Sequence, residues 1–471
     1  MKRTLAALAA AAVSLTLFAA IAYAQAAAQP QAVMPWGMFR ADPPHTGCYA
    51  SPPLAGLKQQ MWRFETRGAV ISSPVIAGGM VYVGSDDKHV YAIDLLTGQE
   101  RWRHKMDEGV ASSPAVAEGL VFVGCEDDHF YALDAATGVE RWRFKAGGGI
   151  QSSPVVNAGL VYFGCDDKRL YCLDMRSGAE RWSLKTRKDV AASPAQAGSM
   201  VYVGDTGGNF YAVDAVAGTE RWYVKTEKGI LASAAVVDGV VYVGDESGSL
   251  YALDALTGQQ KGLFKADGRI ATSPAVMGGI LYVGSDDKYL YAIDIKAGQV
   301  RWRVRTEDKI RSSPALAGGV VFFGSNDDHV YALDAATGEV RWKFRTGKDV
   351  QSSPAVFDGI IVVGSNDEAV YAMQASVAGP VPPPPPMQPV PPPPPMPPTP
   401  VQPVPPPPPT PPAPVPPPPT PPPAPMPPPP PVPVQPVPPP PPTPPAPVPP
   451  PPPTPPDPVP PPPPVPPPLT P

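Results

Sequence analysis

The chain has 471 residues and a formal net charge of −5 at pH 7. Because binding to nucleic-acid phosphates needs a basic face, this charge argues against DNA or RNA as a partner. Composition also changes along the chain: it holds 77 Pro, most of them after residue 379, which excludes one uniform globular domain.

Residues 1–24 predict a secretory signal peptide. Lys2 and Arg3 form a basic start, Leu5–Ala22 is apolar, and Ala22-Tyr23-Ala24 is a small-x-small cleavage site. A membrane anchor is the alternative, but the apolar run is barely long enough to cross a bilayer. We therefore expect an exported protein, periplasmic or cell-surface/extracellular, with no transmembrane segment after cleavage. Residues 25–55 follow as an N-terminal lead-in.

Eight copies of one 40-residue unit, without insertions, fill residues 56–375. A fixed period of this length is typical of repeat architectures. In the unit 110–149, four short runs rich in β-formers (112–117, 120–124, 130–134 and 140–145) alternate with turns. Each unit is therefore predicted to form a four-stranded antiparallel blade, and the domain an all-β, eight-bladed β-propeller. One Ser marks the same position in every unit: Ser73, Ser113, Ser153, Ser193, Ser233, Ser273, Ser313 and Ser353.

Seven Trp share one register, on the fourth strand of the unit, where we expect them to dock neighbouring blades. Trp62 comes before the first full unit, whereas the last unit stops after its third strand, at Tyr371-Ala372-Met373. The segment 60–66 is therefore predicted to complete the eighth blade and close the ring. The sixth position of the register holds Gly262, which predicts a weak seam unless Phe264 fills the space. The seven Trp are Trp62, Trp102, Trp142, Trp182, Trp222, Trp302 and Trp342.

Export would permit disulfides among the four cysteines. Cys125 and Cys165 occupy equivalent positions of adjacent units and are the expected bridge, although four Cys allow three full pairings. Cys172 replaces the Ala of the repeated Tyr-Ala-Leu-Asp and is interpreted as a small buried residue. No Cys/His spacing suggests a metal site.

Two sets of polar residues are candidates for binding. Paired acids repeat in one turn of the unit, from Asp86-Asp87 to Asp367-Glu368; they could form cation sites, but turn chemistry explains them more simply. The position before each Ser pair varies, and Gln151, Arg311 and Gln351 could form a polar sector at the mouth of the central channel. A wet rim without a ligand is the simpler interpretation of these three.

Residues 376–471 form a proline-rich tail whose only charge is Asp457. Such a segment cannot donate regular backbone hydrogen bonds and has little to bury, so we expect a disordered polyproline segment. It could act as a stiff spacer or as a ligand for aromatic grooves.

The repeated residues resemble a known family. Ala332-Leu333-Asp334-Ala335-Ala336-Thr337-Gly338 followed by Arg341-Trp342 resembles the tryptophan-docking repeat of pyrroloquinoline-quinone (PQQ) dehydrogenases and of PQQ-like repeat propellers. Trp36–Pro43 with His45-Thr46-Gly47 is similar to the lead-in of many such propellers. The family includes enzymes and also non-catalytic scaffolds, such as the propeller lipoproteins of bacterial outer-membrane protein assembly. This chain has no lipid-attachment Cys at its cleavage point.

For a quinone enzyme, the resemblance implies a cofactor stacked on a Trp near the ring axis, Ca²⁺ held by carboxylates, and a carboxylate base. Seven of the eight Trp are in the repeat register, Trp36 precedes the ring, and neither a vicinal Cys pair nor an inserted loop is present. We therefore predict no catalytic residue, cofactor or metal site. The predicted function is an exported scaffold that binds unidentified envelope proteins; the alternatives are a PQQ-dependent quinoprotein dehydrogenase and a surface binding or adhesion module.

Overall fold

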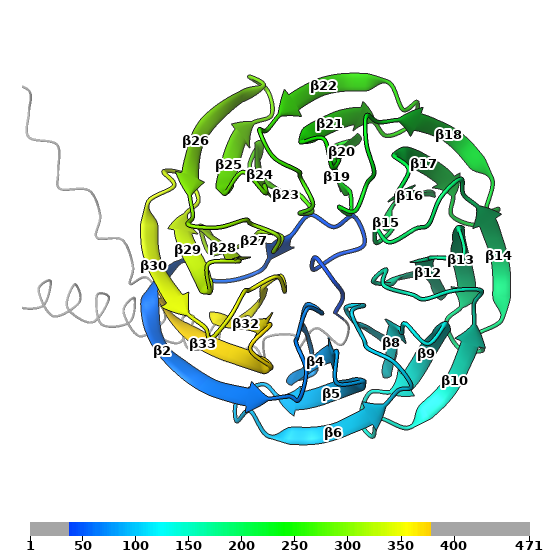
Figure 1. Ribbon diagram of the computed structural model, residues 1–471, viewed down its shortest axis with the longest axis horizontal. Helices are drawn as coiled ribbons and strands as arrows, with labels where there is room; N and C mark the ends of the chain where they lie inside the picture. Colours follow the sequence, from blue (N-terminus) through cyan, green and yellow to red (C-terminus); the bar gives the residue numbers. More distant parts are fainter. Residues whose placement is uncertain (1–36, 378–471) are drawn as a thin grey trace, which may run out of the picture. The chain divides into compact units, whose positions relative to one another are not determined.

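The computed structural model describes residues 37–377, which form a ring of eight β-sheets around a central channel (Figure 1). The predicted eight-bladed propeller of four-stranded antiparallel blades is confirmed. Within this range no helix is long and apolar enough to span a membrane. The predicted signal peptide and proline-rich tail lie outside the described residues.

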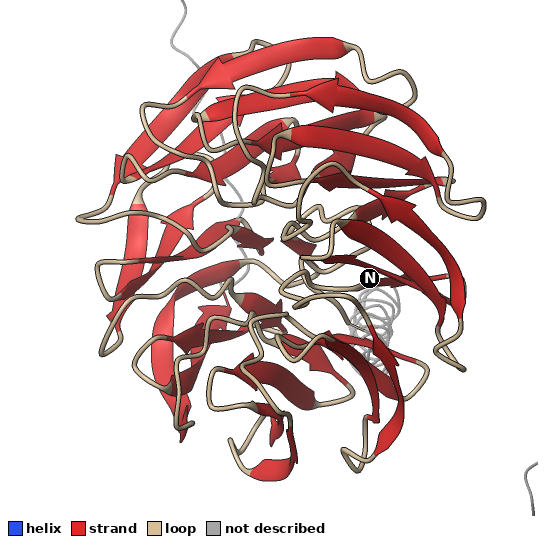
Figure 2. Ribbon diagram, turned by 45° about the vertical axis from the view of Figure 1, so that its right-hand side comes forward, coloured by secondary structure: helices blue, strands red, loops and turns tan. Residues whose placement is uncertain are grey.

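Each blade runs from a short innermost strand at the channel to a long outermost strand at the rim (Figure 2). The innermost strands, from blade 1 to blade 8, are β3 (Val75–Ala77), β7 (Ala115–Ala117), β11 (Val155–Asn157), β15 (Ala195–Ala197), β19 (Ala235–Val237), β23 (Ala275–Met277), β27 (Ala315–Ala317) and β31 (Ala355–Phe357). The second strands are β4 (Met80–Ser85), β8 (Leu120–Gly124), β12 (Leu160–Cys165), β16 (Met200–Gly204), β20 (Val240–Gly244), β24 (Ile280–Gly284), β28 (Val320–Ser325) and β32 (Ile360–Ser365).

The third and outermost strands complete each antiparallel sheet. The third strands are β5 (His89–Asp94), β9 (His129–Asp134), β13 (Arg169–Asp174), β17 (Asn209–Asp214), β21 (Ser249–Asp254), β25 (Tyr289–Asp294), β29 (His329–Asp334) and β33 (Ala369–Val377). The outermost strands of blades 1 to 7 are β6 (Glu100–Lys105), β10 (Glu140–Lys145), β14 (Glu180–Lys185), β18 (Glu220–Lys225), β22 (Gln260–Lys265), β26 (Gln299–Arg305) and β30 (Val340–Arg345).

The N-terminal strand closes the ring, as predicted. β2 (Leu54–Glu65) is the outermost strand of blade 8 and pairs antiparallel with β33, with Trp62 opposite Ala372. Blade 8 is thus built from both ends of the domain, so that the two ends hold each other in the sheet. A further two-residue strand, β1 (Cys48–Tyr49), adds in parallel to β27 and makes blade 7 five-stranded.

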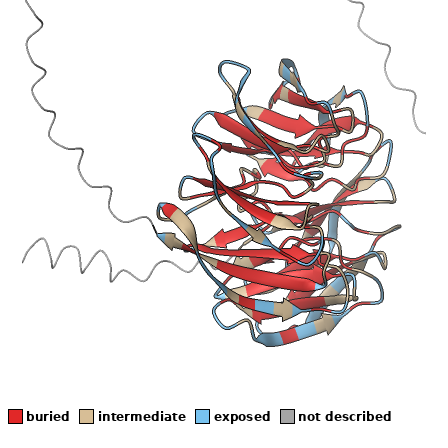
Figure 3. Cartoon of the chain, turned by 60° about the vertical axis from the view of Figure 1, so that its left-hand side comes forward, coloured by how far each residue is buried: buried red, intermediate tan, exposed pale blue. Residues whose placement is uncertain are grey.

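The core lies between the blades. The second and third strands are buried almost throughout, whereas the outermost strands alternate exposed and partly buried side chains (Figure 3). Two-sided burial explains why the inner strands are continuously apolar, and one-sided burial explains the charged–aromatic alternation of the fourth strands.

The Ser repeated in every unit links the blades around the channel. The backbone N–H of Ser73 donates to Oγ of Ser113 at 2.9 Å, and the same bond recurs at every step of 40 residues. The circle closes where the Ser353 N–H donates to Oγ of Ser73, also at 2.9 Å. These buried hydroxyls satisfy backbone donors that would otherwise lie unpaired in the core. The repeat register is therefore also a register of inter-blade hydrogen bonds.

The Trp register forms the outer part of each seam. Six indoles donate Nε1–H to a backbone carbonyl of the next blade at 2.8–3.2 Å. Each of the six also covers a turn Gly of that blade so closely that a Cβ there would lie 2.6–2.7 Å from the indole. Trp342 differs because blade 8 continues as β33 where the others turn, and its Nε1 has no partner within the described range.

Candidate functional site

The lead-in crosses one mouth of the central channel (dark blue in Figure 1). Its backbone bonds to the middle residue of five innermost strands. Gly37 forms a bridge with Val116, and carbonyls of the lead-in accept from the N–H groups of the other four strands at 2.8–3.0 Å. The four strand residues are Gln196, Val236, Val276 and Leu316. The chain thus covers inner strand edges on blades 2, 4, 5, 6 and 7 with its own backbone.

A buried guanidinium fixes this segment. Arg40 is 2% exposed and donates to the carbonyls of Pro274, at 2.7 Å, and Pro314. Burial lowers the pKa of Arg40 to about 10, so it remains charged at neutral pH. Gly47 permits the approach, because a Cβ at its φ of +70° would lie 2.3 Å from Nη2 of Arg40. Residues 37–55 are therefore a structural part of the ring.

His45 is buried in the same segment and carries no charge. Burial, and secondarily the charge of Arg40, lowers the pKa of His45 to about 3. Its imidazole packs edge-on against Phe39, with ring centroids 5.6 Å apart. Asp42 turns the chain here by accepting from both the N–H and the hydroxyl of Thr46, at 2.8 and 2.6 Å. These residues shape the lead-in rather than present reactive groups.

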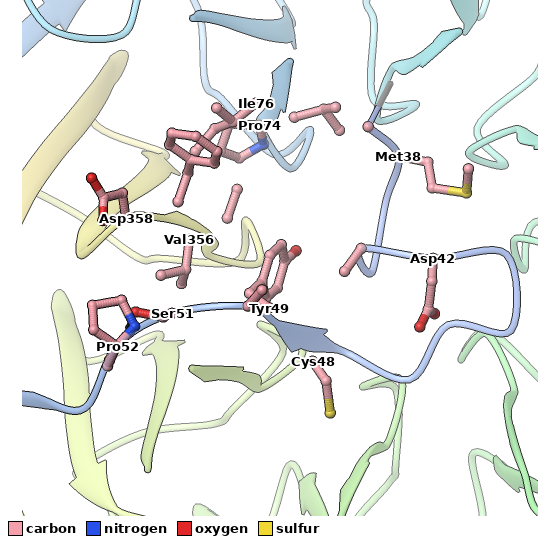
Figure 4. Close-up of a pocket in the computed structure, with 16 residues that line it drawn as sticks. Met38, Asp42, Cys48, Tyr49, Ser51, Pro52, Pro74, Ile76, Val356 and Asp358 are labelled. Atoms are coloured by element: carbon pink, nitrogen blue, oxygen red, sulfur yellow. Dashed lines mark hydrogen bonds between the residues drawn. The ribbon is translucent and has the colours of Figure 1, made fainter. Parts of the chain in front are cut away.

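Beside the lead-in, a hollow of about 670 Å³ lies over the innermost strands of blades 8 and 1. Figure 4 shows Tyr49, Pro74, Ile76 and Val356 around it. Phe357 also lines the hollow, so its lining is mainly apolar. Burial raises the pKa of Tyr49 to about 12, and its hydroxyl remains protonated. The hollow lies where described lead-in residues make no backbone bond to the middle residue of β3 or β31.

The structure does not gather Gln151, Arg311 and Gln351 into one site. They precede innermost strands of blades 3, 7 and 8, so Gln151 lies across the ring from the other two (Figure 1). Gln151 is exposed and Gln351 half-buried, while Nε of Arg311 pairs with Asp286 at 3.3 Å. The three residues precede the innermost strands, whereas the lead-in bonds to the middle residues of such strands. A binding role for the three residues remains a prediction.

The acidic turns serve mainly as structure. In six blades one Asp of the turn accepts the hydroxyl of the Tyr four residues later, as Asp87 does from Tyr91 at 2.6 Å. That Asp is the partner the repeated Tyr needs. Within residues 37–377 no group of three or more His, Cys, Asp or Glu side chains could hold a metal ion.

The acidic residue directly before this Asp has a different environment in blades 1 to 3. Burial raises the pKa of Asp86 and of Asp166, with the neighbouring carboxylates adding to the effect. The pKa of Glu126 is raised by burial and then by Asp86 and Asp166 themselves. Their 40-residue spacing was the available signal, since it places them side by side on blades 1 to 3.

The cysteines depart from the expected pairing. All four are free, so the structure lacks the Cys125–Cys165 bridge. Each of the two thiols instead donates to a carbonyl of its own inter-blade loop, at Glu108 and Gly148 respectively. The Ser85 hydroxyl, at the equivalent position of blade 1, makes the same contact with the Gly68 carbonyl. Each of the two thiols therefore lies in the same local environment of its own blade and does not face the other. Cys172 is fully buried.

The described residues do not fit the PQQ site that the fold family implies. All seven ring indoles lie on outermost strands, away from the axis, and six are hydrogen-bonded to a neighbouring blade. Ca²⁺ would need a set of carboxylate oxygens. At the mouth that the lead-in crosses, the carbonyls of Pro274 and Pro314 instead accept hydrogen bonds from the Arg40 guanidinium, which is itself a cation.

Comparison with known proteins agrees with the geometry. The family model described as outer membrane protein assembly factor BamB matches residues 57–106, 86–188, 142–262 and 260–376. No curated protein matches the sequence. Similar solved structures include BamB from Moraxella catarrhalis, with 19% identity and a TM-score of 0.59 over 67% of this chain and 99% of that one.

Two other structures share the fold. The computationally designed Ika8 protein has 20% identity and a TM-score of 0.62, covering 67% of this chain and 99% of its own. Quinohemoprotein alcohol dehydrogenase from Comamonas testosteroni has 17% identity and a TM-score of 0.63, covering 72% and 80%. At these identities the likeness concerns the fold alone, which catalytic and non-catalytic proteins share.

Proposed function

We propose that this chain, which belongs to the family of the outer membrane protein assembly factor BamB, is an exported, non-catalytic scaffold that binds proteins of the bacterial cell envelope. The observation that carries the proposal is the mouth of the channel. There the chain's own lead-in covers five innermost strands and leaves an apolar hollow over blades 8 and 1. Such a surface can bind a partner without any reactive group.

The hollow suits an extended polypeptide. Its volume of about 670 Å³ lies within the range of ligand sites. Ile76 and Val356 are the middle residues of two neighbouring innermost strands whose backbone edges make no bond with described lead-in residues. The lead-in itself shows how a chain binds there, since β1 adds to β27 as a parallel strand. A partner segment can add to a strand edge in the same way and place apolar side chains in the hollow.

The two ends of the sequence fit an exported scaffold. The leader expected at residues 1–24 would deliver the propeller to the envelope, where an apolar face can meet envelope proteins. The proline-rich tail would extend from the domain as a stiff spacer or offer polyproline ligands to a partner.

Pull-down from a bacterial envelope extract tests the proposal, using the mature chain with and without residues after 377. Phe357→Asp places a charge in the hollow and should remove the proteins that the unaltered chain retains. Leu256→Asp is the matched control, because Leu256 is 80% exposed and lies elsewhere. Equal melting temperatures of the two variants would show that both are folded. The same proteins retained by Phe357→Asp would refute the role of the hollow.

A second experiment tests the absence of quinone chemistry. The purified chain with added PQQ and Ca²⁺ should show neither dye-linked dehydrogenase activity nor a shift in melting temperature. A ligand that binds only the folded state must raise its stability. A stabilisation that saturates with PQQ would therefore contradict the proposal even if no substrate were found.

A further inference from the structure

The seam between blades 5 and 6 lacks the indole that fills the equivalent place elsewhere. Gly262 stands in the Trp register, and a Cβ built there meets only the Cβ of Ala252, at 3.6 Å. Across the seam, the turn residue Gly298 has no heavy atom within 4 Å of such a Cβ. The six glycines equivalent to Gly298 are each covered by an indole: Gly98, Gly138, Gly178, Gly218, Gly258 and Gly338.

Phe264 has not moved into the vacancy. It packs edge-on against Tyr291 with ring centroids 5.1 Å apart. Its equivalents Phe64, Phe144 and Phe344 pack in the same way against their own Tyr, at 5.3–5.6 Å. The side chain thus keeps its usual place in the repeat, and the space beside Gly262 and Gly298 stays open.

The vacant position also has an unused hydrogen-bond acceptor. In the six filled seams the carbonyl equivalent to that of Ile295 accepts the indole N–H, as Ala255 does from Trp222 at 3.2 Å. In four seams a Tyr hydroxyl donates to the same carbonyl, as Tyr202 does to Ala255 at 3.0 Å. Within residues 37–377 the Ile295 carbonyl receives neither bond, and the equivalent Tyr242 hydroxyl donates to no protein atom.

The walls of the vacancy are otherwise those of a filled seam. Tyr242 and Ala252 lie on one side and Ile295 with Gly298 on the other, and Tyr242 is only 6% exposed. Ala252 is partly exposed, whereas its equivalents in the other blades are fully buried. Gly262 lies on an outermost strand, at the rim of the ring, so the position can be reached from solvent. An aromatic ring entering from the rim would continue the inter-blade interface on both sides.

We propose that this vacancy binds the indole of a tryptophan from a partner polypeptide. The filled seams show which group fits: a flat ring against the turn glycine, with an N–H directed at the neighbouring carbonyl. Phenylalanine has no donor for Ile295, and a bulky side chain on residue 262 would exclude the ligand. This inference rests on the proposed scaffold function, since it names one side chain by which a partner docks.

Titration of the full mature chain, labelled with ¹⁵N-glycine, with N-acetyl-L-tryptophanamide tests the site. The amide signals of Gly262 and Gly298 should shift and saturate, while that of Gly119 on a distant turn should not. N-acetyl-1-methyltryptophanamide lacks the indole donor and should bind at least several-fold more weakly. N-acetyl-L-phenylalaninamide should bind weakly or not at all. Absence of a saturable shift at both Gly262 and Gly298 would refute the proposal.

Two variants provide the matched controls. Gly262→Trp supplies the indole from within the chain, so it should abolish the shift at Gly298 and raise the melting temperature by a few degrees. Trp222→Gly copies the vacancy into the seam between blades 4 and 5, and should add a second site that shifts Gly258. Retained binding in folded Gly262→Trp would refute the site, and if that variant did not fold, the titration of the unaltered chain decides.

The seam and the scaffold proposal can fail separately. If envelope proteins bind the hollow but N-acetyl-L-tryptophanamide leaves Gly262 and Gly298 unshifted, only the seam site is refuted. If the indole probe binds but the extract yields no partner that Gly262→Trp releases, the vacancy is a binding site and its role in docking a partner is refuted.

Discussion

Replacing Trp62 by Ala should weaken the closure of the ring. Trp62 is the one register indole on β2, and only 8% of it is exposed. Its Nε1 donates to the Leu95 carbonyl of blade 1 at 2.8 Å, and its ring covers Gly98. It therefore joins blade 8 to blade 1 at the rim of the ring, while the Ser353 N–H joins them near the channel by donating to Oγ of Ser73.

The size of the effect follows from these contacts. Truncating a buried Trp to Ala costs about 3–5 kcal/mol, and the lost hydrogen bond contributes about 1 kcal/mol. Because the cavity opens at the rim and water can reach the Leu95 carbonyl, we expect a total of about 4 kcal/mol. Unfolding entropy of about 2.1 cal/mol/K per residue gives roughly 0.7 kcal/mol/K for this domain. The melting temperature should therefore fall by about 6 °C.

Differential scanning calorimetry of the full chain measures the change, and hydrogen exchange locates it. Lys58→Ala is the control, because Lys58 is an exposed residue of the same strand, and surface changes usually stay within about 0.5 kcal/mol. Faster exchange in Trp62→Ala should centre on β2 and β33. A melting temperature within 1 °C of the unaltered chain would show that β2 does not lock the ring through this indole.

Three further outcomes are expected. Folding holds His45 neutral by lowering its pKa to about 3, so only the unfolded state gains a proton at His45 as the pH falls below about 6.5. At pH 5 this proton uptake lowers the free energy of unfolding by about 2 kcal/mol. A difference in stability between the unaltered chain and His45→Gln that is equal at pH 7.5 and pH 5 would contradict this expectation. Ser73→Ala removes the acceptor of the buried Ser353 N–H and should lower stability by about 2 kcal/mol in chemical denaturation, whereas an unchanged midpoint would show that the hydroxyl circle is dispensable. Unfolded, non-reduced protein should give four reactive thiols, and a count of two would show that one disulfide forms.

Local repetition made the fold readable from the sequence. Blades 1 to 7 each take their four repeat strands from within 40 residues, so the period predicted the number of blades. The position of Trp62 and the shortened last unit predicted the closure of blade 8. The repeat also predicted the vacancy at Gly262, because seven Trp occupy the equivalent position of the other units and their register shows where a large side chain is missing. It misled for Cys125 and Cys165, since equivalent positions in neighbouring blades share an environment without facing each other.

Tertiary structure alone decided the path of the lead-in and what the vacancy contains. Gly37 to Pro52 have no repeat to indicate their partners, and their bonds reach blades up to 274 residues away, as between Arg40 and Pro314. The hollow beside Tyr49 lies where that path makes no backbone bond to the middle residues of β3 and β31. Likewise, whether Phe264 would fill the seam depended on competition with Tyr291, which the sequence cannot weigh. Position in the repeat is set by local chain geometry, whereas occupancy of a space is set by which distant side chains reach it.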